Sequence, residues 1–255
     1  MSEKILEIKN LVKHFGGLIA TKNVSFFVKK GERMGILGPN GAGKTTVFNQ
    51  ISGFIIQDSG DIYYKGQKIN KLKPNKRAMM GLVRTFQIVR PFHEMTLSQN
   101  LIVPFVSPRG KKVLKESGKT MQESIDNILH KIGLYDDRNM MVDKLPHGEL
   151  KKLEIAKVSA LKPDIIMLDE PFGGLSVVEI EKLSDYLIQL NKDEGITFVI
   201  IEHRLREFMK LVERLVVLNY GELIAEGTPA EIIKNPKVIE AYLGKGGADV
   251  AAAGN

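Results

Sequence analysis

The segment Gly38–Thr45 has the residue types and spacing to hold a polyphosphate chain. Its sequence, GPNGAGKT, matches the pattern G-x-x-x-x-G-K-[ST]. Glycines let the backbone wrap closely, so that successive N–H groups point at phosphate oxygens. Lys44 adds a positive charge for the β- and γ-phosphates, and Thr45 offers a hydroxyl to Mg²⁺. The residues expected to bind the nucleotide here are Gly38, Pro39, Asn40, Gly41, Ala42, Gly43, Lys44, Thr45 and Thr46.

Two acids follow an apolar run further along the chain. Ile165–Leu168 is typical of a buried parallel strand, and Asp169 and Glu170 come directly after it. Asp169 is in the position to hold Mg²⁺ beside the phosphate loop. Glu170 would face the γ-phosphate and polarise an attacking water, which makes it a candidate general base. An acid after a strand also caps helices, but a complete phosphate loop upstream favours the catalytic interpretation.

The elements around these residues fit a phosphate loop between a strand and a helix. Met34–Leu37 predicts the buried strand that precedes the loop, and residues 46–51 predict the start of a helix after it. Alternating apolar residues before the loop indicate antiparallel strands, and Gly60–Gly66 indicates a further hairpin. Between Pro104 and Leu145 the apolar residues recur at helical spacing, which predicts a helical insert between the two chemical motifs.

Composition limits the class of protein. The chain has 255 residues, of which 43% are hydrophobic and 26% charged, as in an ordinary globular protein. No run of about 18 apolar residues is present, and the first residues lack the plan of a signal peptide. The absence of cysteine excludes disulfides and thiolate metal sites. The net charge is +7, but the lysines are scattered without interleaved aromatics, which argues against binding of nucleic acid.

With these motifs, the chain resembles the ATPase subunits of ATP-binding-cassette (ABC) transporters from about Ile5 to Leu243. Gln87 matches the glutamine that contacts Mg²⁺ or water in that family. His203, after another buried strand, matches the switch histidine near the γ-phosphate. Phe15 matches the aromatic residue that stacks on adenine, although packing in the core is an alternative for it.

The family's signature motif, Leu-Ser-Gly-Gly-Gln, is altered in this chain. The corresponding residues are Leu145, Pro146, His147, Gly148 and Glu149. The resemblance implies that this segment meets the nucleotide of a second subunit. Pro146 removes a hydroxyl and an N–H from it, whereas Gly148 and the helix dipole remain. Ser176 stands where many relatives carry Asp or Asn in the segment called the D-loop.

Two further stretches, and the form of the signature motif itself, are similar to the LivG-like ATPases of branched-chain amino-acid importers. One stretch is Gly81–Gln87 together with Pro91–Thr96, and the other is Glu231–Gly244. The resemblance implies an ATPase with ATP and Mg²⁺ that powers import of branched-chain or related amino acids. It implies as partners a second ABC ATPase subunit, identical or different, two transmembrane permease subunits and, indirectly, an extracytoplasmic substrate-binding protein. The chain would lie at the cytoplasmic face of the membrane.

The predicted fold class is α/β, with a P-loop NTPase core, an antiparallel β-subdomain and an α-helical subdomain. We expect residues 1–255 to form a single ABC ATPase domain. Residues 1–87 and 151–243 would form the core with the β-subdomain, residues 88–150 the helical subdomain, and residues 244–255 a flexible tail. The alternatives are an ATPase of the lipopolysaccharide-export type, a non-transport ABC ATPase, and a regulatory module that binds ATP without turnover.

Overall fold

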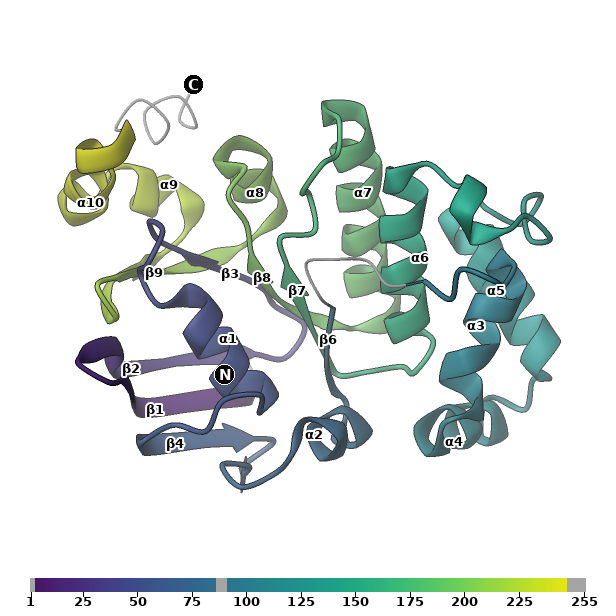
Figure 1. Cartoon of the computed structure of the whole chain (residues 1–255), viewed down its shortest axis with the longest axis horizontal. Coiled ribbons are helices and arrows are strands. Elements are labelled where there is room, and N and C mark those ends of the chain that lie inside the picture. Colours follow the sequence, from purple (N-terminus) through teal and green to yellow (C-terminus); the bar gives the residue numbers. More distant parts are fainter. Residues whose placement is uncertain (1–2, 86–90, 247–255) are drawn as a thin grey trace.

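The architecture consists of two sheets and a group of helices, seen in a computed structural model that describes residues 3–85 and 91–246 (Figure 1). The first sheet is antiparallel, with the order β2-β1-β4-β5. Its strands are β1 (Lys4–Phe15), β2 (Leu18–Lys29), β4 (Ser59–Tyr64) and β5 (Gln67–Lys68). This sheet confirms the antiparallel strands that the alternating apolar pattern predicted on both sides of the phosphate loop.

The second sheet carries the chemical motifs and has the order β10-β9-β3-β8-β7-β6. Its strands run parallel except β10, which pairs antiparallel with β9. Their bounds are β3 (Arg33–Leu37), β6 (Leu82–Arg84), β7 (Ile165–Asp169), β8 (Thr197–Ile201), β9 (Arg214–Asn219) and β10 (Glu222–Gly227). Both β7 and β8 are buried along their whole length, as expected for interior parallel strands covered on two faces.

The helices separate into those that surround the sheets and those of the insert. Around the sheets lie α1 (Lys44–Ser52), α2 (Pro74–Met80), α7 (Val177–Glu194), α8 (Leu205–Leu211), α9 (Pro229–Ile233) and α10 (Pro236–Gly246). The insert contains α3 (Leu97–Val106), α4 (Pro108–Ser117), α5 (Met121–Ile132), the 3-10 helix η1 (Val142–Lys144) and α6 (His147–Ser159). In Figure 1 the insert lies beyond β6 and α7, at the far end of the molecule from β9 and α10.

Two apolar clusters hold these layers together. One joins the antiparallel sheet and α1 to one face of the parallel sheet, with Phe48, Ile62 and Met167 among its buried members. The other joins the helices of the insert and α7 to the opposite face, with Phe105, Leu153 and Leu187. The parallel sheet is therefore covered on both faces, and its carboxyl edge is the part that remains accessible to a ligand.

Arg77 fixes the helix that follows the phosphate loop. It is 1% exposed, and its guanidinium donates to the carbonyls of Gln50 and Ile51 at the end of α1, at 2.7 and 2.6 Å. It also donates to the carbonyl of Ile69, at 2.9 Å. Burial lowers the pKa of Arg77 to about 10. The cation satisfies carbonyls that the helix end leaves without intrahelical partners, and it joins α1 to the antiparallel sheet.

The end of the chain differs slightly from the sequence expectation. Helix α10 extends to Gly246, so the first three residues of the predicted flexible tail, residues 244–246, are helical. The remaining residues of that tail, 247–255, lie outside the described residues.

Candidate nucleotide-binding site

Residues Gly38–Gly43 connect β3 to α1 in backbone conformations that require glycine. Gly38 and Gly43 have φ angles of 152° and 100°. A Cβ at Gly38 would lie 2.2 Å from the carbonyl oxygen of Leu218, and one at Gly43 would lie 2.3 Å from that of Ala20. The loop is thus packed against β9 and β2, and a side chain at either glycine would collide with backbone. This close-fitting backbone is what a phosphate cradle needs.

Lys44 is held inside the curve of this loop. Its ammonium donates to the carbonyls of Gly38 and Pro39, at 2.7 and 3.0 Å. The side chain is 6% exposed, and burial lowers its pKa, while the charge of Glu170 acts in the opposite direction. A buried cation that faces carbonyl oxygens gains from an incoming anion. The loop and its lysine therefore fit a phosphate ligand.

The other residues of the predicted loop site lie on either side of Lys44 in the chain. Thr45 is exposed and Thr46 half-buried in the first turn of α1. Pro39, Asn40, Gly41 and Ala42 line a pocket of about 460 Å³ with residues of α10 and the turn at Tyr220. Tyr242 of α10 also reaches the loop. Burial raises the pKa of its hydroxyl, and a hydrogen bond with the backbone of Gly38 acts against that rise.

Asp169 ends β7 beside the loop, and its carboxylate is paired. Arg84, at the end of the neighbouring strand β6, donates to it at 2.5 Å. Arg84 also donates to the side chain of Asn49 in α1, at 2.5 Å. Asp169 is 8% exposed, so the guanidinium balances a carboxylate that burial would otherwise penalise. With the hydroxyl of Thr45, this carboxylate supplies the oxygen donors that Mg²⁺ prefers, so the residues present fit that ion.

Glu170 and His203 meet at the carboxyl edge of the sheet. Nε2 of His203 lies 2.9 Å from Oε1 of Glu170. The pairing of β7 with β8 places Asp169 opposite Ile201, which brings the residues that follow each strand together. Glu170 has a φ of 50°, a conformation that residues with a Cβ adopt rarely. The backbone therefore turns sharply at the residue that the sequence predicts as general base.

Glu202 connects the segment after β7 to the segment after β8. It is 2% exposed, and its carboxylate accepts from the backbone N–H groups of Phe172 and His203, both at 2.6 Å. Carboxylates that accept backbone N–H groups form strong, charge-assisted hydrogen bonds. Glu202 thus fixes the two segments that hold Glu170 and His203.

Phe15 lies at the tip of the β1–β2 hairpin and is 47% exposed. This exposure removes the alternative that it packs in the core. The same hairpin approaches the phosphate loop, since Ala20 is the residue whose carbonyl would meet a Cβ at Gly43. Lys13 lies over the Phe15 ring at 5.6 Å. An exposed ring beside the loop offers a face for stacking.

The signature segment, residues Leu145–Glu149, lies on a different part of the molecule. Pro146 is the N-cap of α6, and His147, Gly148 and Glu149 form the first turn. Figure 1 shows β7 between α1 and α6, so the loop of this chain and its own signature segment stand on opposite sides of that strand. Pro146 and His147 are exposed, as a segment that meets another molecule requires.

Gln87 lies outside the described residues, so its predicted contact with Mg²⁺ or water stays a prediction. Next to it in the chain, the described residues Phe92 and Met95 are 44% and 37% exposed. Met141, which is 36% exposed, lies next to them because Thr96 forms a β-bridge with it.

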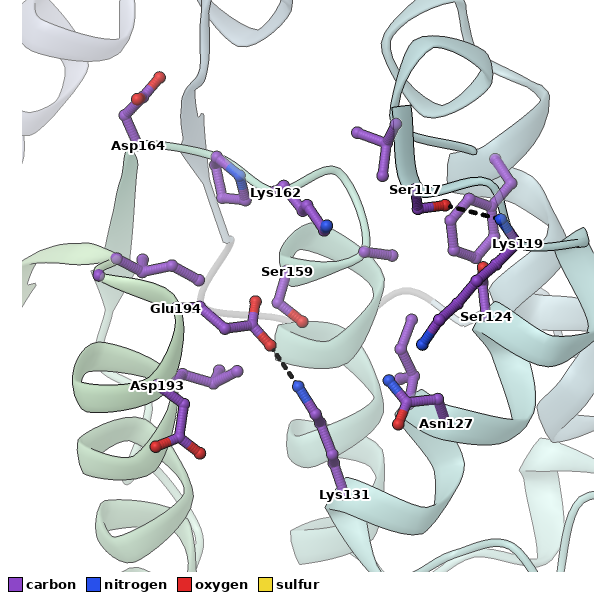
Figure 2. A pocket seen from close by; sticks show the side chains of 18 of the residues that line it. Ser117, Lys119, Ser124, Asn127, Lys131, Ser159, Lys162, Asp164, Asp193 and Glu194 are labelled. Carbon is purple, nitrogen blue, oxygen red and sulfur yellow. Dashed lines mark hydrogen bonds and ion pairs between the residues drawn. The ribbon is translucent and has the colours of Figure 1, made fainter. Parts of the chain in front are cut away.

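A separate pocket of about 560 Å³ opens at the amino edge of the sheet, between the insert and α7 (Figure 2). Lys119, Lys131 and Lys162 line it, and Lys131 pairs with Glu194 at 2.6 Å. The helices α4, α6 and α7 end there, and cations are favourable at the negative ends of helix dipoles. These lysines therefore have a structural explanation, and the pocket is not part of the nucleotide site.

Sequence reasoning missed Arg84, Glu202 and Glu179. Arg84 and Glu202 lie in motifs for which a role was predicted from the sequence, but that role was assigned to the neighbouring residues Gln87 and His203. A charged residue at the end of an apolar strand was the available signal for both. Glu179 was detectable as the last residue of Ser176-Val-Val-Glu179, a capping box, but that pattern predicts only the start of a helix.

Comparison with known proteins identifies the family. The profile of the family described as ABC transporter matches residues 21–173, which include the phosphate loop, Asp169 and Glu170. The chain belongs to the ABC transporter ATPases. A second profile, described as branched-chain amino acid ATP-binding cassette transporter, matches residues 222–248. This cassette is therefore of the branched-chain amino acid type, as the signature variant and the carboxy-terminal stretch predicted.

Relatives of the cassette agree over nearly the whole chain. It is 38% identical to the high-affinity branched-chain amino acid transport ATP-binding protein LivG of Escherichia coli K12, over 96% of this chain and 100% of that protein. It is 36% identical to the probable LivG of Methanocaldococcus jannaschii, over 95% and 98%. The ADP conformation of MJ1267, an ATP-binding cassette of an ABC transporter, superposes with a TM-score of 0.84 at 33% identity, covering 96% of this chain and 100% of that one.

These findings confirm the predicted fold class and the predicted activity. The cassette is an ATPase that binds ATP and ADP, and it is a component of an ABC transporter complex. A dimeric cassette, MJ0796 bound to ADP and Pi, matches with a TM-score of 0.72 at 25% identity, covering 88% of this chain and 98% of that one. Among residues 3–85 and 91–246, no helix is both long and apolar enough to cross a bilayer.

Proposed function

We propose that this cassette powers the import of branched-chain amino acids through separate membrane subunits, with the roles of its residues as assigned below. The observation that carries the catalytic part is the meeting of Lys44, Asp169, Glu170 and His203 at the carboxyl edge of one parallel sheet. The substrate class is supported by the names of the LivG relatives and by the match at residues 222–248. The alternatives of a lipopolysaccharide exporter and of a non-transport ATPase have no such support.

The phosphate loop holds the nucleotide. Backbone N–H groups of Gly38–Gly43 and the first turn of α1 face the phosphates, because the glycines permit an inward-facing backbone and the helix dipole favours an anion. Lys44 turns its ammonium from carbonyl oxygens to phosphate oxygens, a stronger, charge-assisted contact. Thr46 lies in the same first turn, and Phe15 stacks on the base.

Thr45 and Asp169 would hold Mg²⁺, with Gln87 as a further contact that the family resemblance implies. When bound, the ion supplies neutralisation of charge on the β- and γ-phosphates. Arg84 orients the Asp169 carboxylate at the end of β7. Arg84 is therefore a positioning residue, since its guanidinium contacts Asp169 and affects the phosphates only through that carboxylate.

Glu170 acts as general base and His203 keeps it in position. The carboxylate accepts a proton from the attacking water, and the imidazole at 2.9 Å fixes the rotamer of that carboxylate. His203 also offers its ring to the γ-phosphate. Glu202 keeps the distance between the two segments constant, because it is hydrogen-bonded to both.

A second ABC ATPase subunit, identical or different, completes each nucleotide site. Because the signature segment stands on the far side of β7 from its own loop, it serves the nucleotide of the partner in a head-to-tail dimer. Gly148, the α6 dipole, the exposed Pro146 and His147 and the half-buried Glu149 form that contact.

The apolar residues near Gln87 are the surface that we assign to the binding of the permease subunits. Phe92, Met95 and Met141 expose apolar surface beside the end of α6, where Lys157 lies over the Phe92 ring at 4.8 Å. Such a patch on an ATPase that works at a membrane suits a helix of another subunit. The cassette would then lie at the cytoplasmic face of the membrane, and an extracytoplasmic binding protein would deliver the amino acid.

The test is transport by a reconstituted complex. The cassette is co-purified with its permease subunits, placed in proteoliposomes containing Mg-ATP on the cassette side, and supplied with the binding protein and labelled leucine. We expect ATP-dependent uptake of leucine by the native complex and background uptake with Glu170→Gln. Stimulation of ATP hydrolysis by an unrelated solute, without uptake of any branched-chain amino acid, would refute the proposed substrate class.

A further inference from the structure

The start of α6 rests on the segment that leads into α7. Nε2 of His147 lies 3.3 Å from the carbonyl oxygen of Gly173, and a Cβ at Gly174 would lie 3.2 Å from the His147 ring. The same segment is tied to the catalytic edge, because the N–H of Gly173 donates to the carbonyl of Glu170 at 3.2 Å. The signature segment is therefore in contact, within its own chain, with residues that continue from the general base.

Glu179 reaches from the first turn of α7 to the first turn of α6. One carboxylate oxygen, Oε2, accepts from the hydroxyl and the N–H of Ser176, at 2.7 and 2.8 Å, in a capping box. The other, Oε1, would lie 2.6 Å from a Cβ placed on Gly148. The Ser176 hydroxyl lowers the pKa of Glu179 most, followed by the Ser176 N–H, and the N–H of Gly148 lowers it further. An ionised carboxylate thus stands at the amino end of α6.

Capping alone does not account for this contact. Glu123 in α5 and Glu231 in α9 occupy the same position of equivalent capping boxes. For Glu123 the threonine at the N-cap lowers the pKa, with a smaller effect from the charge of Lys119, and for Glu231 the N-cap threonine alone does so. The carboxylate of Glu179 in addition approaches the first turn of another helix, where its Oε1 lies close to Gly148. Its negative charge therefore lies at the amino end of α6, in the position that an external anion would take at a helix N-terminus.

We propose that Glu179 is a positioning residue whose carboxylate stands beside Gly148 in the separate subunit and must withdraw before the Gly148 amide binds the γ-phosphate held by the partner's loop. This inference rests on the head-to-tail dimer of the proposed function. A carboxylate beside Gly148 and a phosphate bound to the Gly148 amide would repel each other at short range. Glu179 thereby sets how much ATP is needed to close the dimer.

The release need not uncap α7. Oε2 keeps its bonds to Ser176 while Oε1 turns away from Gly148, because the hydrogen bonds to Ser176 are made by Oε2 and the approach to Gly148 by Oε1. Glutamine at this position of a capping box still accepts from the N-cap N–H. The substitution Glu179→Gln therefore removes the charge at Gly148 and keeps the start of α7, which separates competition from a merely structural role.

The experiment measures ATP-dependent dimerisation in a protein that does not turn ATP over. Glu170→Gln is compared with Glu170→Gln/Glu179→Gln by analytical ultracentrifugation over a titration of Mg-ATP. We expect the ATP concentration at half-maximal dimer to fall at least threefold when Glu179 becomes glutamine. The matched control, Glu170→Gln/Glu123→Gln, changes another capping box, and its midpoint should stay within about 1.5-fold.

Each outcome bears on the proposal. An unchanged or higher midpoint for Glu179→Gln would overturn it, because Glu179 would then support the signature segment instead of competing with the phosphate. Should that variant fold poorly, Glu179→Asp retains the charge and draws the carboxylate back from Gly148, and its midpoint should also fall. A Glu170→Gln protein that forms no dimer at any ATP concentration removes the proposed dimer itself, and this inference with it.

Discussion

The phosphate loop and the signature segment differ in what holds them in place. The loop joins the buried strand β3 to α1 and packs against β9 and β2, and its cation bonds to its own carbonyls. The signature segment is the first turn of a helix in the insert, and it contacts the core through the short segment Gly173–Glu179. The difference indicates that the phosphate loop is a preformed half of the nucleotide site. The signature segment is the provisional half, because its contacts with residues of its own chain can be replaced by the nucleotide that a partner holds.

The catalytic edge of the preformed half gives the largest expected effect. Replacing Glu170 by glutamine removes the base but keeps the shape beside His203. Because a positioned general base contributes about 10²–10⁴-fold to rate, steady-state ATP hydrolysis should fall by roughly that factor while Mg-ATP binding persists. Phosphate-release assays and equilibrium binding measure the two quantities on the same protein. Native turnover by Glu170→Gln would place the base elsewhere.

The phosphate loop should lose affinity when its cation is removed. Lys44→Ala deletes a buried, charge-assisted donor, which contributes about 1.5–3 kcal/mol. Mg-ATP binding measured by calorimetry should therefore weaken by roughly 10- to 150-fold. Lys162→Ala, which removes a lysine from the pocket at the amino edge, is the control and should bind ATP normally. Binding by Lys44→Ala within threefold of the native protein would contradict the loop assignment.

On the provisional half, charge should matter more than size. A side chain at Gly148 meets Oε1 of Glu179 at 2.6 Å, at the flexible end of that side chain, so Gly148→Ala should be tolerated in part. Gly148→Asp adds a second carboxylate where the phosphate is expected, and hydrolysis with the partner subunits present should fall at least about tenfold. The alanine variant separates steric from electrostatic effects. Equal rates for Gly148→Asp and the native protein would mean that this segment does not face a nucleotide.

The smallest effect is expected at Pro146. Its φ and ψ of −56° and 151° are extended, as an N-cap requires, but proline has no side-chain oxygen to cap α6. Pro146→Ser should add a cap worth up to about 1 kcal/mol, visible as a higher melting temperature, and should leave hydrolysis unchanged or raise it less than about threefold. A strong loss of hydrolysis would show that the proline itself is needed in the signature variant.

Contiguous motifs made most of the site predictable from sequence. The loop Gly38–Thr45 needs only neighbours in the chain to form, since glycine spacing and the following helix define it. The strand over Ile165–Leu168 was predicted to within one residue of β7, because a short buried apolar run between turns has few alternatives. Family resemblance, rather than periodicity, supplied the interpretation of Pro146–Glu149.

Pairs across the sheet could not be predicted in this way. Arg84 and Asp169 are 85 residues apart in the chain, and Glu170 and His203 are 33 apart. They meet because β6, β7 and β8 are neighbours in a parallel sheet and end at one edge. Apolar runs reveal that strands exist but not which strands pair, and the pairing depends on how helices cover the two faces.

The sequence by itself determined the phosphate loop, the two acids at the carboxyl end of β7 and the family. Only the tertiary structure decided that Arg84 balances Asp169, that Glu202 joins the segments of Glu170 and His203, and that Glu179 meets Gly148. The physical reason is that local motifs are set by backbone conformation within a few residues. A buried charge, by contrast, is stable only beside a partner that the packing of distant elements brings to it.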